Sequence, residues 1–133
     1  MFRLVKIKNG RCNQPEPEKL GATASETYTL GEALVLSGGA VTKCGATAKP
    51  TYIAGEDYTA PESGARRVTV YPVSADMIFE APLTAAPTAL TDGSAVTLSA
   101  DGLGVTATTT SGVATIVDLA GAAASGDKIL VRF

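Results

Sequence analysis

The sequence predicts an all-β protein: a small β-barrel or sandwich built from two related β units, with an extended N-terminal arm. Short runs of β-branched and apolar residues recur at a spacing of about 8–12 residues, which is typical of barrels and sandwiches. Glycines mark the turns between these runs, and one strand–turn–strand phrase occurs twice. Helix-forming periodicity is almost absent from the chain.

Residues 1–8 mix apolar residues with Arg3, Lys6 and Lys8, and predict a short strand with positive charge. Asn9-Gly10 then predicts a turn, because both residues tolerate a positive φ.

Pro15 and Pro17 favour an extended, polyproline-like course without internal hydrogen bonds. We therefore expect 9–25 to be an arm or linker rather than a packed element. On this interpretation, 1–25 forms an N-terminal strand and arm whose removal leaves the β body folded.

The first β unit is expected to span 26–86. Gly38-Gly39 predicts a tight turn between two strands, and 58–66, which contains a proline and a glycine, predicts a loop. Its strands are expected at 26–36, 40–44, 51–54, 67–73 and 77–83.

The second unit is expected to span 87–133 and to begin within an Ala-, Pro- and Thr-rich junction at 84–90. The alternative is one compact domain of residues 26–133. At 119–124 the alanines allow one helical turn at most, because Gly121 interrupts them. Strands are expected at 93–99, 104–110, 114–119 and 128–133.

The internal repeat is the clearest organisational signal. Gly31–Ser37 is echoed by Gly93–Ser99, and later strands follow in the same order in both halves. The alternative is that short strand-like segments resemble one another by coincidence in a chain rich in Val, Thr and Ala.

The core is expected to be thin. Hydrophobic residues make up 45% of the chain, but many are alanine and only 5% of residues are aromatic. Alanine buries little apolar area. Such a chain either relies on a partner or on oligomerisation for stability, or is an ordinary stable monomer.

Charge and composition exclude several classes. A net charge of −2 argues against nucleic-acid binding, which needs a concentrated basic face. No apolar run is long enough for a membrane span, and the N-terminus lacks the pattern of a secretion signal. Synthesis in a reducing cytosol is therefore expected, with Cys12 and Cys44 unpaired rather than bridged.

Catalytic chemistry is not predicted. There is no histidine, which removes the commonest base and metal ligand and the usual Ser-His-Asp and Cys-His sites. The cysteines have no C-x-x-C partner, the acidic residues fall at predicted turns, and the glycine pairs precede no helix. We expect no enzyme activity, no cofactor and no metal.

The candidate binding residues are basic and apolar side chains near the N-terminus and at one strand start. A basic arm could lie across an acidic partner surface, or its lysines could simply protect a solvated edge strand. Arg66-Arg67, near Tyr71, could form a stacking and charge patch for single-stranded nucleic acid, or could face solvent or a subunit interface at a strand start. The candidate interface residues are Phe2, Arg3, Leu4, Lys6, Lys8, Arg11, Arg66 and Arg67.

The phrase Tyr28–Val41, with Gly31-Glu32 before the strand and Gly38-Gly39 after it, resembles the hairpin of small capsid decoration (cement) proteins of tailed bacteriophages. This resemblance covers mainly residues 28–73 and extends through the repeat to 93–133. The apparent duplication and the N-terminal arm depart from the simplest members.

The resemblance implies a structural protein of the capsid surface that is made in the host bacterial cytoplasm. It would bind the outer surface of the assembled major capsid protein shell and stabilise it, as a homo-oligomer with a trimer favoured. The alternatives are a carbohydrate- or receptor-binding β module of a phage fibre, and a tail-tube or head-completion subunit.

Overall fold

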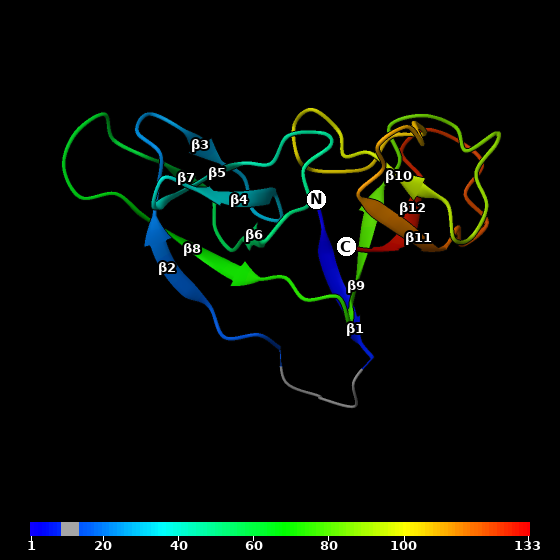
Figure 1. Ribbon diagram of the computed structural model, residues 1–133, viewed down its shortest axis with the longest axis horizontal. Helices are drawn as coiled ribbons and strands as arrows, with labels where there is room; N and C mark the ends of the chain where they lie inside the picture. The colour runs from blue at the N-terminus through cyan, green and yellow to red at the C-terminus, as the bar shows by residue number, and fades with distance from the viewer. Residues whose placement is uncertain (9–13) are drawn as a thin grey trace.

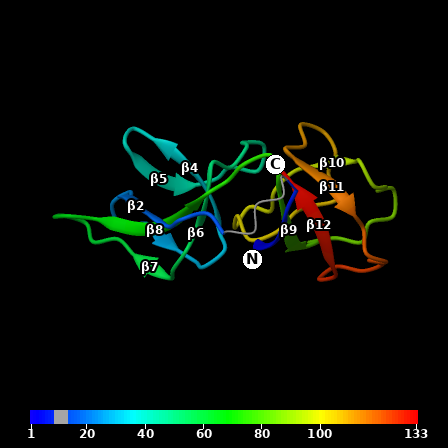
Figure 2. The same cartoon turned by 90° about the horizontal axis from the view of Figure 1, so that it is seen from below.

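The computed structural model describes residues 1–8 and 14–133, and it confirms the all-β class. No helix occurs within these ranges. Two five-stranded antiparallel sheets and one two-stranded sheet form two lobes side by side (Figure 1). Neither large sheet closes into a barrel, so the body is sandwich-like. Figure 2 shows both chain ends near the centre, between the lobes.

The first lobe contains one five-stranded sheet in the order β2-β8-β6-β4-β5. The hairpin turn at Gly38-Gly39 joins β4 to β5 as predicted, and both glycines have positive φ. A two-stranded sheet of β3 and β7 lies beside them. The strands are β2 (Glu18–Gly21), β3 (Thr27–Tyr28), β4 (Ala33–Ser37), β5 (Ala40–Lys43), β6 (Tyr52–Ala54), β7 (Tyr58–Thr59) and β8 (Arg67–Pro72).

The second lobe contains the other sheet, in the order β1-β9-β12-β11-β10. Its edge strand β1 comes from the start of the chain, and the next strand, β2, belongs to the first lobe. The strands are β1 (Arg3–Ile7), β9 (Met77–Pro82), β10 (Ala95–Val96), β11 (Ala114–Asp118) and β12 (Lys128–Arg132).

The two sheets have the same series of strand pairings. β2 pairs with β8 as β9 pairs with β12, and β8-β6-β4 is matched by β12-β11-β10, all antiparallel. Even an unusual parallel bridge recurs, between Ala22 and Val41 in one lobe and between Leu83 and Val105 in the other.

The turns that lead into β4 and β10 also correspond. Gly31 and Gly93 have φ of 79° and 89°, a region in which glycine has no Cβ penalty. Each glycine N–H donates to the neighbouring strand, Gly31 to the Ala54 carbonyl and Gly93 to the Ile116 carbonyl, both at 2.8 Å. The phrase that the sequence repeats is therefore a repeated turn geometry.

The N-terminal segment differs from the expected arm. Residues 18–21 form β2 and pair with β8, while β1 pairs with β9 of the same chain. Removal of 1–25 would therefore delete a strand from each sheet, so it cannot leave both intact. The turn expected at Asn9-Gly10, and with it Arg11 and Cys12, lies outside the described residues. Prolines mark an extended course but do not distinguish a free arm from an edge strand.

Strand β9 pairs with the second lobe, although its sequence neighbours suggested the first unit. Residues 58–66, expected to be only a loop, begin with β7. In contrast, 104–110 forms only isolated bridges at Val105 instead of a strand. There the Ser99 hydroxyl bonds both the N–H and the carbonyl of Gly104, at 2.8 and 3.1 Å, and so replaces regular pairing.

The helical turn allowed at 119–124 is instead a tight turn. Ala120 and Gly121 both have positive φ, and the Ala122 N–H donates to the Leu119 carbonyl at 2.8 Å.

The main apolar core crosses the boundary between the lobes. It joins Ala33 and Ile53 of the first sheet to Phe79 and Val131 of the second. A smaller core around Tyr28 belongs to the first lobe alone. Because the larger core needs both sheets, the lobes pack as one body.

Phe2 ties the two lobes together. Its N–H donates to the Gly31 carbonyl in the first lobe at 2.8 Å. Its ring is 3% exposed and packs edge-on against Phe133 of the second lobe, with a centroid distance of 5.3 Å. Further main-chain bonds join the lobes, such as Ala33 N–H to the Gly102 carbonyl at 2.8 Å.

Phe2→Ala should lower the free energy of unfolding by about 3–5 kcal/mol, because it leaves a cavity where the two lobes meet. Urea titration followed by circular dichroism measures this change. Val5→Ala is the matched control, since Val5 is exposed in β1, the strand that follows Phe2, and its truncation should cost less than about 0.5 kcal/mol. Equal costs for the two variants would contradict the clamping role of Phe2.

Candidate functional site

Strand β1 separates the N-terminal candidate residues onto two sides. Phe2 is buried and Leu4 is partly buried against the main core. Arg3 pairs opposite Glu80 and Lys6 opposite Ile78, on the face of the sheet that points away from that core. Side chains directly opposite in an antiparallel pair share a face, so the basic residues of β1 face solvent while the apolar residues anchor the strand.

Arg66 and Arg67 lie elsewhere, at the start of β8 in the first lobe (Figure 1). The Arg66 guanidinium donates to the carbonyls of Ala22 and Glu62, at 3.3 and 2.9 Å. The Arg67 guanidinium donates to the Lys19 carbonyl at 2.9 Å. Both arginines therefore brace local backbone, and the structure does not bring them together with β1.

The outer face of the second lobe's sheet gathers basic residues from two strands that are distant in sequence. In β12, Lys128, Leu130 and Arg132 alternate with buried Ile129 and Val131. Because Leu130 lies opposite Glu80, these three residues share the face of Arg3 and Lys6. We call this surface the basic face and define it by Arg3, Lys6, Lys128 and Arg132.

Two carboxylates share the basic face, Glu80 and Asp118. The face thus has four positive and two negative groups, a net of +2, whereas the whole chain is −2. Glu80 lies 3.0 Å from both the Lys128 ammonium and the Arg3 guanidinium. Hydrogen bonds from Lys128 and Arg3 lower the pKa of the Glu80 carboxyl, which keeps it ionised between them.

Sequence reasoning missed Lys128 and Arg132. Charged and apolar residues alternate over most of 128–132, and this pattern predicts a strand with one face exposed to solvent. What the sequence did not reveal was that this strand lies next to β9 and shares a face with β1.

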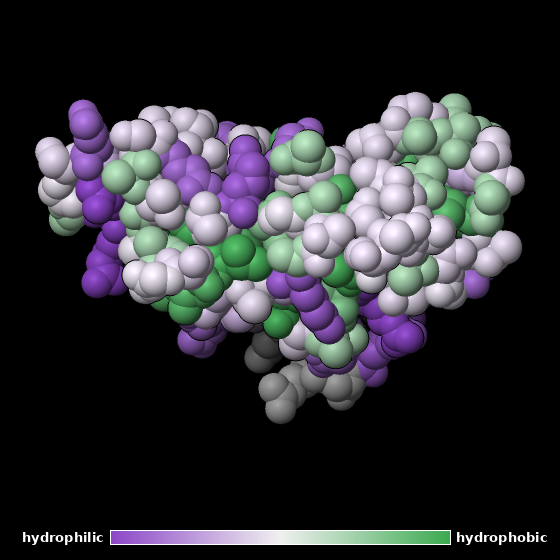
Figure 3. Space-filling view, turned by 45° about the horizontal axis from the view of Figure 1, so that its top comes forward, coloured by the Kyte–Doolittle hydropathy of each residue, from purple (hydrophilic) through white to green (hydrophobic). Residues whose placement is uncertain are grey.

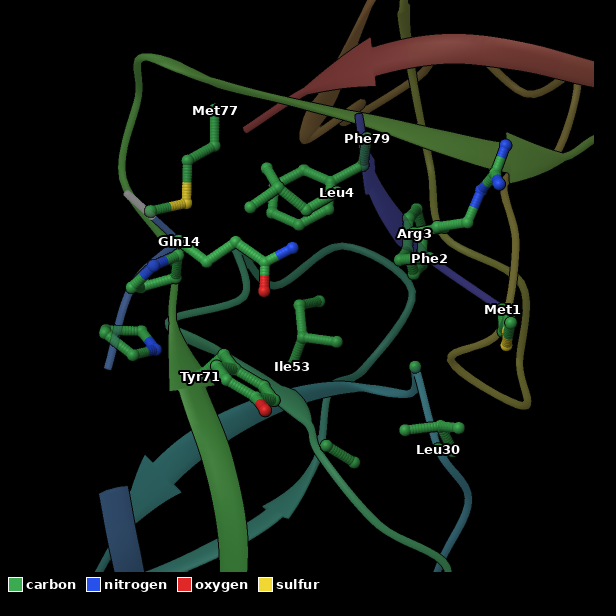
Figure 4. Close-up of a pocket in the computed structure, with 14 residues that line it drawn as sticks. Met1, Phe2, Arg3, Leu4, Gln14, Leu30, Ile53, Tyr71, Met77 and Phe79 are labelled. Carbon is green, nitrogen blue, oxygen red and sulfur yellow. The ribbon is translucent and has the colours of Figure 1, made fainter. Parts of the chain in front are cut away.

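An apolar groove of about 280 Å³ lies between β1 and β9 on one side and β6 and β8 on the other (Figure 4). Two of its lining side chains are unusually exposed for apolar residues, Met1 at 53% and Leu30 at 44%. The main lining side chains are Met1, Leu4, Gln14, Leu30, Ile53, Tyr71, Met77 and Phe79.

Polar groups also reach this groove. The side chain of Gln14 points into it in Figure 4. Strand β1 is an edge strand, and the Phe2 N–H points away from β9 to Gly31. Strand alternation directs the main-chain groups of Leu4 the same way, away from β9.

The buried carboxylate of Glu32 has a structural role. One oxygen accepts the Thr29 N–H at 2.8 Å, and the other lies 3.1 Å from the Lys43 ammonium. These contacts close the turn before β4. At the equivalent turn the Ser94 hydroxyl accepts the Thr91 N–H at 3.1 Å, so this position serves the turn in both lobes.

Charge is distributed unevenly over the chain. Residues 81–127 contain four aspartates and no lysine or arginine. In Figure 3 the second lobe is mostly pale, a surface of small and weakly polar residues, while hydrophilic residues gather on the first lobe and below the body. Within 1–8 and 14–133 no three Cys, Asp or Glu residues group as metal ligands, and no helix is long and apolar enough to cross a membrane.

These features define a two-lobed, all-β module with a basic sheet face and an apolar groove. No protein-family model matches the chain, and no curated protein matches it in sequence. Among solved structures, the chain is similar to the N base of head fiber protein gp8.5 of bacteriophage phi29, with a TM-score of 0.57 and 16% sequence identity. The match covers 89% of this chain and 94% of that chain. At this identity the likeness shows a shared fold.

Cys44 should be chemically inert in the folded protein. Burial raises the pKa of its thiol to about 11, and the thiol donates to the Ala48 carbonyl at 3.0 Å. In a Cys12→Ser variant, iodoacetamide at pH 8 should modify Cys44 only after denaturation, as mass spectrometry would show. Rapid modification of the folded protein would contradict its burial.

The same thiol predicts a pH dependence of stability. Unfolded Cys44 ionises near its ordinary pKa of 9.0, while the folded thiol stays protonated to about 11. The free energy of unfolding should therefore fall as pH rises through this window. Urea titrations from pH 8 to 11 measure the fall, and Cys44→Ala should lose that part of it.

Proposed function

We propose that this chain is a structural protein of a bacteriophage virion that binds the outer surface of the assembled major capsid protein shell. Its action there is to hold neighbouring shell subunits together, as a decoration protein does, and it involves no catalysis. The observation that supports a virion role is the likeness to the head fiber base, which extends over nearly the whole of both chains.

The basic face supports a docking role. It is a sheet surface on which main-chain bonds fix the positions of the strands that carry the charged side chains. A net positive charge on such a surface steers a partner of opposite sign and sets its orientation. We therefore assign the shell contact to this face and expect its partner surface to be acidic.

The same likeness favours a second function comparably, namely the base module of a phage fibre. A base would also need a rigid β body, but its function would be to hold a fibre rather than to strengthen the shell. Shells loaded with the chain should resist heat or denaturant better if it is a decoration protein, and should be unchanged if it is only a base.

Assembly and duplication belong to the same proposal. Matching pairings in the two lobes support two copies of one β unit within the chain. Symmetric shells favour oligomeric partners, and we propose a homo-oligomer with a trimer favoured. Light scattering during size-exclusion chromatography would give the mass directly.

Charge reversal on the basic face should weaken shell binding. Lys6→Glu with Arg132→Glu is the sharpest variant, because neither residue forms an ion pair with another residue in the described parts of the chain. We expect at least about a tenfold loss of affinity at low salt, measured by co-sedimentation with expanded empty shells of the same phage.

Lys19→Glu with Lys49→Glu is the control, with the same change of charge at exposed sites in the first lobe. It should bind almost as the unmodified chain does. An equal loss in both double variants would mean that net charge matters rather than this face. If the unmodified chain did not co-sediment but bound glycans, the shell proposal would be wrong.

A further inference from the structure

We infer that the apolar groove between the lobes receives an extended segment of the shell protein, in which an apolar side chain is flanked by acidic residues. This inference rests on the proposed function and names the second contact of the same complex. The basic face would orient this protein on the shell, and the groove would hold the segment of the shell protein.

The size of the groove fits a side chain better than a free ligand. At about 280 Å³ it lies just below the usual range for small-molecule pockets but has room for one or two large side chains. Ile53, Tyr71 and Phe79 line it. Protein interfaces commonly concentrate their affinity in such a filled pocket.

The exposed rim indicates that something covers the groove. Met1 and Leu30 are two of the four large apolar residues that remain exposed in the described chain, and both line this groove. The Met1 side chain packs closely on Gly31, next to Leu30. The exposed apolar area is therefore continuous with the groove rather than scattered.

The backbone of β1 favours an extended occupant. Leu4 lines the groove, and its main-chain groups, like the Phe2 N–H, point away from β9 on the free edge of the strand. An extended peptide can pair with such an edge and place alternate side chains into the pocket beside it. The Gln14 amide can bond the peptide backbone on the opposite side.

Charge selects the chemistry of that segment. Of the residues that line the groove, Arg3 is the one with a charged side chain, and Lys6 shares its outer face of β1. Glu80, the carboxylate next to Arg3, is already shared with Lys128. In an extended segment paired with β1, the residues on either side of an apolar anchor point to that outer face, where acidic side chains would complement Arg3 and Lys6.

Photo-crosslinking tests the inference directly. p-Benzoylphenylalanine would replace Leu30 at the groove or, as a matched control, Leu36 in β4, which is 50% exposed but lies outside the groove. Each variant would be bound to expanded empty shells, irradiated and analysed by mass spectrometry. We expect position 30 to cross-link to an acidic, extended segment of the major capsid protein, and position 36 to give at least tenfold less product.

Affinity gives an independent readout. Leu30→Asp should weaken co-sedimentation by about tenfold or more, because it places a carboxylate at an apolar pocket, and Leu36→Asp should have little effect. Circular dichroism would establish that both variants fold.

The outcomes separate the two proposals. If the chain binds shells but position 30 gives no cross-link to them, or cross-links to a second copy of this chain, the groove inference is wrong and the proposed function stands. If the unmodified chain does not bind shells at all, the proposed function fails first.

Discussion

The attachment of β1 to both lobes is the contact on which the rest of the structure depends. Phe2 is bonded to Gly31 in the first lobe, while the strand that follows pairs with β9 in the second. β1 forms one wall of the groove and supplies half of the basic face. The groove and the basic face therefore both depend on the position of β1. The buried side chain of Phe2, which precedes the strand, holds β1 in this position.

The two lobes differ at the edges of β9 and β2 that do not pair with β12 and β8. On β9 this edge is covered by β1. At the start of β2, the position that corresponds to Ile78 is Pro17, which has no N–H to donate. The Lys19 carbonyl of β2 already accepts a hydrogen bond from the Arg67 side chain. Proline and blocked carbonyls are common defences against unwanted strand addition. The β9 edge thus takes an added strand from the same chain, while the matching edge of β2 is blocked.

Local patterns predicted the local structure well. Period-two alternation and the Gly38-Gly39 pair located the β4–β5 hairpin, and the echo of Gly31 by Gly93 identified two turns of equal geometry. Sheet membership was harder, because pairing joins segments far apart in sequence and leaves no local mark. For that reason β2 was expected to be an arm, β9 was expected in the first unit, and Arg132 was not connected to β1.

The Gly38-Gly39 turn gives the protein a practical use as a carrier. A Cβ at either glycine would meet no atom within 4 Å, so the outer side of this turn is open, although the Gly39 backbone lies against Gly21 of β2. Exposed tips of this kind tolerate inserted sequence better than packed termini do, and here Met1 is packed against Gly31. A peptide or fluorescent label placed between the two glycines would be displayed without disturbing β1, whereas an N-terminal tag would emerge beside the groove.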